Sequence, residues 1–411
     1  MKLRFFLLGM MMASTGCFAQ ITLQECRQKA HDNYPVIKQY KLVEQARDFN
    51  IDNAAKGYLP QISVTGLATY HTDMLKSSNI TKTLDTKNSL YGGMVQISEN
   101  IYDGGAISAR KSIAKADAIV SNEQLNVTMY DINNRVDQLY FGALLIDEQI
   151  KQNRLLQEDL ALSRKSIEGM MKNGIANQSD VDAIEVEQLN AAQQEKSLSI
   201  QRHTYMTMLG IFIGEELNES NALTKPSDMM PISMDVKRPE LKLFDAQSAL
   251  LNEREKALNV SIKPKFGVFA SGLFGNTGID MMKKSMLMAG AKLTWNIDGI
   301  YTRKNDKKLI DASRQQIESN RETFLFNTRL QSANETSIIS DLREKLKTDD
   351  DIVILRTNIR SKAERKVENG TLTVNEMLRQ INAESEAKQS KALHEIQLLK
   401  EIYQLKNIVN N

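Results

Sequence analysis

Two parts of the chain alternate between apolar and polar residues, and each begins just after a proline. After Pro60, apolar or small side chains occupy every second position from Ile62 to Tyr70, and most of the residues between them are polar. After Pro264 the alternation is less clean from Phe266 to Phe274, and it is regular again from Ala289 to Ile297. A period of two is typical of strands with one apolar and one polar face. We therefore predict two strand hairpins, with strands at about 60–72, 90–102, 264–275 and 286–298.

Most of the remaining chain has the pattern of long helices. From Leu125 to Ile150, apolar residues recur at alternating steps of four and three positions, which is the seam of a coiled coil. No proline lies between Ala106 and Pro226 or after Pro264, so no proline breaks helical hydrogen bonding there. An average globular helix has only ~11 residues. We predict much longer helices at about 104–172, 177–212, 301–368 and 372–409.

The chain also contains an internal duplication. Pro60 recurs 204 positions later as Pro264, and the dipeptide Asn173-Gly174 recurs 196 positions later as Asn369-Gly370. A step that shortens once between these points indicates a shorter loop in the second copy. Each copy contains a strand hairpin followed by a helix hairpin. We predict two structural repeats, 20–236 and 237–411.

The N-terminus has the features of a secretory signal peptide. Two basic residues precede the apolar run Phe5–Ala13, small residues follow it, and Ala19 fits the cleavage site. We predict that residues 1–19 are removed and that the mature protein is exported. Cys17 leaves an alternative open, in which a lipid is attached to this cysteine.

The composition argues against several classes of protein. The formal net charge is only +2, and nothing in the charge pattern suggests a nucleic-acid partner. The histidines, His31, His71, His203 and His394, have no metal-ligand spacing, and Cys26 has no obvious base. Motifs of a catalytic nucleophile or a phosphate-binding loop are absent from the sequence. We therefore expect no enzymatic activity, no metal site and no cofactor.

The four predicted strands pose a physical problem if they cross a membrane. Each has about nine alternating residues, which suits a tilted transmembrane strand of ~9–11 residues. Four strands leave two edges, and each unpaired backbone group at an edge costs several kcal/mol in hydrocarbon. Several copies of the chain would close the sheet, since the smallest outer-membrane barrels have ~8 strands. The polar alternates would then face a water-filled lumen.

The order of several motifs resembles that of the TolC family of outer-membrane efflux proteins. These motifs are "GYLPQISV", "GGMVQISENIYDGGAISARKSIAKA" and "NGIANQSDVDAIEVEQLNA". The resemblance implies a mostly α fold with a β-barrel part, in which a homotrimer forms a twelve-stranded β-barrel in the outer membrane. A coiled-coil, α-helical tunnel continues the barrel through the periplasm in that family.

The same resemblance implies a function and a set of partners. It implies a passive exit duct of a tripartite efflux pump or a type I secretion system. The implied partners are a periplasmic adaptor (membrane fusion protein), an inner-membrane transporter and the lipid of the outer membrane of a Gram-negative-type bacterium. Neither the transported substrate, whether drug, metal or protein, nor the resting state of the gate follows from the sequence.

The resemblance assigns roles to three groups of residues. The strand-to-helix corners match Asp103, Gly104, Gly105, Asp298 and Gly299. The turns at the tips of the helix hairpins, where an adaptor is expected to dock, match Asn173, Gly174, Asn369 and Gly370. Candidate charges at the tunnel entrance are Asp180, Asp182, Glu368 and Glu376. These carboxylates either attract cations at the entrance or are ordinary solvated charges at helix ends.

A structural coiled-coil protein or a periplasmic adaptor is the alternative function. Heptad helices fit such a rod as well as they fit a tunnel. The strand hairpins favour the channel, because a soluble rod has no need of strands with one apolar and one polar face.

Overall fold

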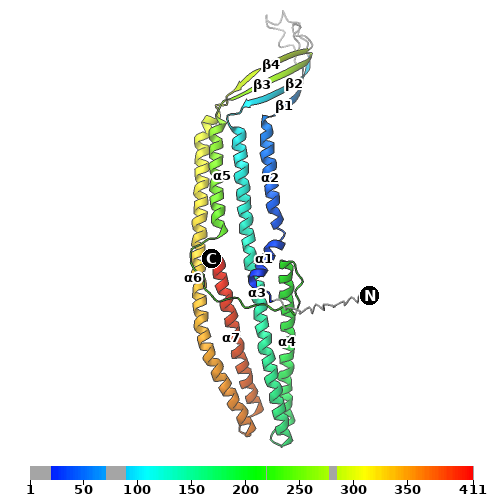
Figure 1. The fold of residues 1–411 in the computed structure, drawn as a ribbon, viewed down its shortest axis with the longest axis vertical. Coiled ribbons are helices and arrows are strands. Elements are labelled where there is room, and N and C mark those ends of the chain that lie inside the picture. Colours follow the sequence, from blue (N-terminus) through cyan, green and yellow to red (C-terminus); the bar gives the residue numbers. More distant parts are fainter. Residues whose placement is uncertain (1–19, 71–88, 219, 277–284, 411) are drawn as a thin grey trace, which may run out of the picture. The chain divides into compact units, whose positions relative to one another are not determined.

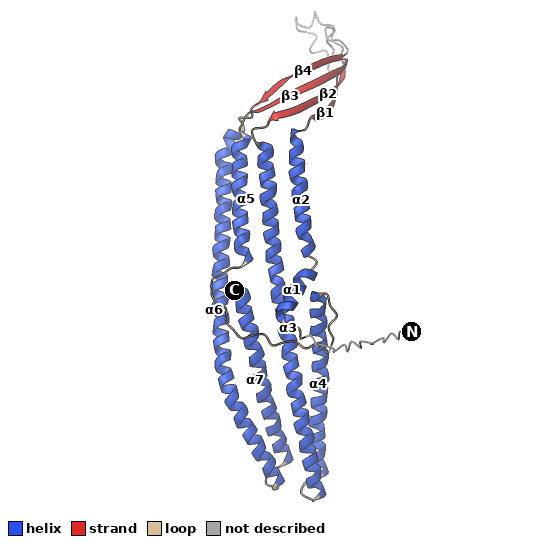
Figure 2. Cartoon of the chain, viewed as in Figure 1, coloured by secondary structure: helices blue, strands red, loops and turns tan. Residues whose placement is uncertain are grey.

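The structure is a computed structural model that describes residues 20–70, 89–218, 220–276 and 285–410. The expected signal peptide 1–19, with Cys17, lies outside the described residues, as does His71. Figure 1 follows the elements along the chain and Figure 2 separates helices from strands. The helices and strands are α1 (Leu23–Asn33), α2 (Ile37–Ala55), a 3₁₀ turn (Lys56–Tyr58), β1 (Gln61–Tyr70), β2 (Ser89–Tyr102), α3 (Ala106–Lys172), α4 (Gln178–Ile213), α5 (Pro239–Ser261), β3 (Lys265–Asn276), β4 (Ser285–Thr294), α6 (Gly299–Glu368) and α7 (Val374–Val409).

The described chain is mostly helical with two strand hairpins, which confirms this part of the predicted fold class. The chain divides into two compact units. One consists of the described residues within Met1–Ile37, Thr128–Arg238 and Phe326–Asn411, and the other of those within Lys38–Val127 and Pro239–Leu325. Each unit thus draws on both expected repeats. The division of the sequence at residue 236 stays a prediction.

The second unit, which we call the strand unit, contains one four-stranded antiparallel sheet in the order β1-β2-β3-β4. The register pairs Val64 with Val95 and Gly66 with Gly93, so the period-two faces of neighbouring strands coincide. β4 ends at Thr294, short of the expected end at residue 298. Its partner β3 begins opposite Thr294 at Lys265, and the preceding Pro264 has no N–H to extend the ladder.

Prolines also mark the helix ends of the strand unit. α5 begins with Pro239, where a missing N–H costs nothing because the first helical N–H groups have no partner in the helix. α5 ends before Pro264 and α2 ends before Pro60, the two prolines after which the sequence pattern predicts strands. Each of these two helices therefore ends at its proline, and a strand begins directly after the proline.

The first unit, which we call the hairpin unit, contains two helix hairpins, the C-terminal part of α3 with α4 and the C-terminal part of α6 with α7. The heptad seam predicted in α3 is buried, with Ile132, Val136 and Ala143 at most 2% exposed. Near the turns, one apolar cluster joins the two hairpins: Leu160, Ile167, Val181, Ile184, Ala191, Val367, Val374, Met377, Leu378 and Ile381. The helices of this unit therefore pack as a coiled-coil bundle.

Among the described residues, no helix has both the length and the apolar content that crossing a bilayer requires.

Candidate functional site

The turns of the two helix hairpins have the same backbone geometry. At the first turn, the N–H of Ile175 donates to the carbonyl of Met170 at 3.0 Å, and Gly174 adopts a φ of 72°. At the second turn, the N–H of Thr371 donates to the carbonyl of Lys366 at 2.9 Å, and the φ of Gly370 is 65°. This helix ending needs a left-handed residue, which glycine adopts without the steric cost of a Cβ. The duplicated Asn-Gly pairs are thus duplicated helix stops.

Each turn is followed by a capping box that starts the returning helix. The side chain of Asn177 accepts the N–H of Asp180 at 3.1 Å, and the carboxylate of Asp180 accepts the N–H of Asn177 at 3.0 Å. Thr373 and Glu376 make the equivalent reciprocal pair before α7. Such a box satisfies two N–H groups that otherwise lack a partner at the helix start. The turn residues Asn173, Gly174, Asn369 and Gly370 remain exposed beside these caps.

The four candidate entrance charges lie close to the turns but differ in their bonding. Asp180 and Glu376 hold the capping boxes, and Asp182 accepts a 2.7 Å bond from Gln178. Glu368, at the end of α6, is exposed, and its carboxylate makes no hydrogen bond or ion pair with any described residue. Structural roles account for Asp180 and Glu376, so an entrance role for these two carboxylates stays a prediction.

Next to the turns, an arginine that the sequence analysis did not single out joins three helices of the hairpin unit. Arg360 on α6 donates to both carboxylate oxygens of Asp159 on α3, at 2.6 and 2.9 Å. It also donates to Glu384 on α7 at 3.0 Å and to Glu364 on its own helix at 2.9 Å. A bidentate contact between charged partners is among the stronger hydrogen-bonded pairs. We call this set the tip network.

Burial and hydrogen bonding act in opposite directions on the pKa values of the tip network. Burial alone would lower the pKa of Arg360, but its bonds to Asp159, Glu384 and Glu364 raise it above its usual value. Burial alone would raise the pKa of Glu384, whose side chain is 2% exposed, but bonds from Lys388, Thr357 and Arg360 lower it. Both groups therefore stay charged at neutral pH.

The internal duplication of the sequence places an equivalent arginine in the first hairpin. Arg164 lies 196 positions before Arg360, the same step that relates the two Asn-Gly turns. Arg164 bonds Glu168 one turn further along, as Arg360 bonds Glu364, and it donates to Gln188 on α4 at 3.3 Å. Its side chain is 35% exposed, against 16% for Arg360. Among the described residues, Arg360 bonds the buried carboxylate of Glu384 and also Asp159 on the other hairpin. The side-chain bonds of Arg164 to described residues, in contrast, stay within its own hairpin.

The two strand-to-helix corners of the strand unit differ in detail. Asp103 is buried, and its carboxylate accepts the N–H groups of Gly105 and Ile107 at the start of α3. Gly104 has a φ of 73°, and a Cβ there would lie 2.9 Å from the Cβ of Lys263. At the second corner, the carboxylate of Asp298 accepts the N–H of Gly299 at 3.0 Å and the carbonyl of Asp298 accepts the N–H of Tyr301 at 3.0 Å, and α6 begins at Gly299. The first corner is the more tightly built.

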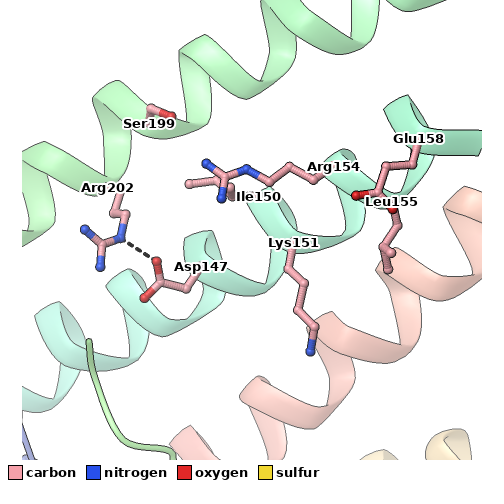
Figure 3. Close-up of a pocket in the computed structure, with 8 residues that line it drawn as sticks. All are labelled: Asp147, Ile150, Lys151, Arg154, Leu155, Glu158, Ser199 and Arg202. Atoms are coloured by element: carbon pink, nitrogen blue, oxygen red, sulfur yellow. Dashed lines mark hydrogen bonds and ion pairs between the residues drawn. The ribbon is translucent and has the colours of Figure 1, made fainter. Parts of the chain in front are cut away.

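A pocket of about 420 Å³ lies between α3 and α4 in the hairpin unit. Figure 3 shows its charged lining, including the ion pair between Arg202 and Asp147. Arg154 also has an acidic partner, Glu195, at 2.7 Å. Because these arginines are already paired, the pocket offers little to an anionic ligand.

Comparisons with known proteins agree with this geometry. The family model described as outer membrane efflux protein matches residues 26–210. This match confirms the resemblance to the TolC family that the sequence motifs indicate. The function predicted from the resemblance is thereby confirmed at the level of an outer-membrane efflux channel that extends into the periplasm. Members of this family are channels rather than enzymes, and they are trimers in efflux pumps.

Solved structures share the fold of this efflux channel. The outer-membrane channel OprN is 14% identical, with a TM-score of 0.70 over 94% of this chain and 89% of that one. VceC from Vibrio cholerae is 9% identical, with a TM-score of 0.67 over 95% and 96% of the two chains. MtrE from Neisseria gonorrhoeae, in its open state, is 11% identical, with a TM-score of 0.66 over 95% and 89%. A search of curated proteins gives no match to the sequence.

Farther from the turns, α6 and α7 of the efflux channel place two carboxyl groups side by side. Glu335 on α6 is 6% exposed and accepts a 3.0 Å bond from Gln404 on α7. Burial, together with hydrogen bonding and repulsion from the Glu401 carboxyl, raises the pKa of Glu335 to about 7. Lys400 bonds Glu401 at 3.2 Å and offsets part of the repulsion. Glu335 is therefore half protonated near neutral pH.

This carboxyl pair predicts a pH-dependent stability. Between the ordinary pKa of 4.5 and about 7, the folded channel holds a proton on Glu335 that the unfolded chain has lost. Stability therefore falls as pH rises through this window, by on the order of 2–3 kcal/mol, and levels off above it. Thermal unfolding in detergent from about pH 5 to pH 8 measures the slope. Glu335→Gln should flatten the curve, and an unchanged slope in this variant would contradict the assignment.

Proposed function

We propose that three copies of this efflux channel close into one tube that serves as the exit duct of a tripartite efflux pump or a type I secretion system. The tube would have a twelve-stranded barrel in the outer membrane and a helical tunnel in the periplasm. Conduction through it is passive, and an inner-membrane transporter supplies the energy. The partners that connect the two membranes are periplasmic adaptors.

The observation that carries this proposal is the strand sheet. Four strands in the order β1-β2-β3-β4 leave β1 and β4 as edges among the described residues, each with a row of backbone groups that lack a strand partner. The register places most of the apolar side chains, from Ile62 to Leu293, on one face of the sheet, which suits contact with lipid. Such edges cannot remain open in hydrocarbon. Pairing β4 of one copy with β1 of the next satisfies both edges, and the strand directions alternate correctly across the joint.

Exposed apolar residues on α2 and α6 support the same closure. On α2, Leu42 and Phe49 are 59% and 66% exposed and lie one heptad apart. On α6, Leu309, Phe326 and Leu330 are 56–67% exposed and fall on the a and d positions of one heptad frame. The bonds from α6 to α5 come from the opposite side of α6, for example from Arg303 to Asn259 and from Arg314 to Asn252. We assign this α6 stripe to the interface with the next copy.

Charges placed on the α6 stripe test the assembly. Leu309→Glu combined with Phe326→Glu buries two carboxylates at each interface, and each costs several kcal/mol. We expect the concentration at which the trimer dissociates to rise by a factor of about 100 or more. Analytical ultracentrifugation in detergent measures this, and planar-bilayer recording should show loss of conductance. The control Gln315→Glu adds a carboxylate to an exposed position of α6 outside the stripe.

The outcomes separate the two parts of the proposal. A double variant that stays trimeric and conducting, with wild-type helical content, would show that the α6 stripe does not lie in the interface between copies. A wild-type protein that is monomeric and forms no pores would refute the tube itself.

The turns of the helix hairpins are the proposed gate and adaptor-docking site. Asn173, Gly174, Asn369 and Gly370 are exposed, and Schellman bonds and capping boxes hold their backbone. Opening requires the two hairpins to move apart, and the tip network and the apolar cluster beside it oppose this movement. The related fold of MtrE is described in an open state, so this architecture is compatible with opening. Disulfide cross-links between neighbouring tips should block export and leave assembly intact.

A further inference from the structure

The register of the strand unit assigns every described strand residue to one of two faces. Directly paired residues lie on the same side of a sheet, and successive residues on opposite sides. Among the residues whose side chains the structure describes, one face is apolar apart from Glu99 and Ser285, and it includes Ile62, Val64, Gly66, Ala68, Tyr70, Tyr91, Gly93, Val95, Ile97, Phe266, Val268, Ala270, Gly272, Phe274, Leu287, Ala289, Ala291 and Leu293. In a closed tube, this is the face that contacts lipid.

The opposite face mixes polar and apolar residues, and its charge is of one sign only. Its described members are Gln61, Ser63, Thr65, Leu67, Thr69, Gly92, Met94, Gln96, Ser98, Asn100, Lys265, Gly267, Phe269, Ser271, Leu273, Gly275, Met286, Met288, Gly290, Lys292 and Thr294. They include two lysines and no acidic residue. Lys265 and Lys292 are not ion-paired with any described residue.

The two lysines lie close together near one end of the sheet. Lys265 is opposite Thr294, and Lys292 is opposite Gly267, so the lysines are diagonal neighbours on adjacent strands. Diagonal neighbours on one face are about 7–8 Å apart. Lys265 is the first residue of β3, next to the helices of the strand unit, so the pair marks the end of the sheet at which those helices begin. No carboxylate on this face of the described strands offsets the two charges.

We propose that Lys265 and Lys292 form a cationic ring in the lumen, which makes the strand-walled part of the channel selective for anions and for anionic groups of its cargo. This inference rests on the proposed closure of three copies, which turns one pair of lysines into a ring of six. Rings of basic side chains favour anions in aqueous pores. The Debye length is ~10 Å at 0.1 M salt and ~3 Å at 1 M, so the selectivity should fade as salt rises.

Reversal potentials in planar bilayers test the ring directly. Under a KCl gradient at low ionic strength, Lys265→Gln combined with Lys292→Gln should lower the chloride-to-potassium permeability ratio by a factor of about 3 or more. Lys265→Glu combined with Lys292→Glu should shift the ratio further toward potassium. Glu99→Gln is the matched control, because Glu99 lies at a similar level on the opposite face, one position from the partner of Gly267. It should leave the ratio unchanged.

Thiol labelling tests the face assignment without relying on conductance. The native thiol of Cys26 is fully buried, so a reagent should reach it slowly. Lys292→Cys should react with a negatively charged, membrane-impermeant methanethiosulfonate at least about ten times faster than Ala291→Cys, which lies on the apolar face.

The possible results distinguish this inference from the proposed tube. Pores whose ion preference is the same in wild type and in both lysine variants would overturn the ring and leave the tube intact. Equal labelling at positions 291 and 292 would overturn the face assignment. A wild-type protein that forms no pores would refute the tube, and the ring with it.

Discussion

Replacing Arg360 with alanine is expected to lower the free energy of unfolding of the efflux channel by about 3 kcal/mol, because it removes the guanidinium that bonds carboxylates on two other helices, one of them buried. Glu384, with a side chain that is 2% exposed, would keep only Lys388 and Thr357. Asp159 on α3 would lose both of its bonds to α6. Thermal unfolding in detergent, at one scan rate for all variants, measures the loss.

The same substitution should also loosen the proposed gate. The bidentate bond from Arg360 to Asp159 links the second hairpin to the first, and opening would have to break it. We expect the variant to show longer or more frequent openings in planar bilayers without an adaptor present. Arg360→Lys keeps the charge but loses the bidentate geometry, so it should fall between wild type and alanine.

Arg164→Ala is the control that the duplicated sequence provides. Arg164 occupies the equivalent position in the first hairpin, but its side chain is 35% exposed and bonds a glutamine where Arg360 bonds Glu384. Exposed ion pairs contribute about 0–1 kcal/mol. Equal losses of unfolding free energy and equal channel openings in Arg164→Ala and Arg360→Ala would mean that the tip network does not hold the gate closed.

The contrast between these two arginines indicates which parts of the structure could be predicted from the sequence. Strands and helices follow from periodicity and from prolines, which act over a few residues. The strand predicted after Pro264 and the heptad seam around Val136 are both present in the structure. The Asn-Gly turns could be predicted as well, since the left-handed backbone of Gly174 and Gly370 is a local requirement.

The tip network could not be predicted in the same way. Arg360 and Asp159 are 201 positions apart, and each lies in a long helix with many other charges. A helical pattern shows which face of a helix is polar but not which charge lies opposite it on another helix. The repeat step identifies Arg164 as the counterpart of Arg360, but not that one copy is buried and the other exposed. That difference arises from packing between the hairpins.

Two of the candidate entrance charges, Asp180 and Glu376, have a structural role that their spacing in the sequence could have indicated. Asp180 and Glu376 are each three positions after a cap residue, and this spacing is the sequence signature of a capping box. The same carboxylates could serve as caps and as entrance charges, because a cap is accessible to solvent at a helix end. Glu368 has no such structural role among the described residues, which makes it the clearest entrance candidate of the four.

A second buried network of the hairpin unit joins α1, α3 and α7. Arg27 on α1 donates its Nε to Asp137 on α3 at 2.7 Å, and its Nη2 to Asn407 on α7 at 3.0 Å. Asn407 in turn donates to Asp137 at 2.6 Å, and its carbonyl accepts the hydroxyl of Tyr130 at 2.7 Å. Asp137 and Asn407 are 6% and 5% exposed. Arg27 and Asn407, which are 380 positions apart in the sequence, thus both bond the carboxylate of Asp137.

Asp137→Ala is therefore expected to be the most destabilising single substitution considered, at about 3–5 kcal/mol. It leaves the guanidinium of Arg27, which is 17% exposed, without a counter-charge and removes an acceptor from the buried amide of Asn407. Unsatisfied buried donors cost about 1–3 kcal/mol each, and more when they are charged. Asp137→Asn retains one acceptor oxygen and should lose less. Thermal unfolding in detergent measures both variants.

Asp131→Ala controls for the loss of an aspartate from the same helix. Asp131 is exposed on α3, and the described residues give it no hydrogen bond or ion pair. Alanine favours the helix slightly more than aspartate does, so this variant should be neutral or slightly stabilised. Because α1 and α7 are both anchored through Asp137, limited proteolysis should cut Asp137→Ala first within these two helices. A variant that melts like Asp131→Ala would mean that the Asp137 network holds neither helix.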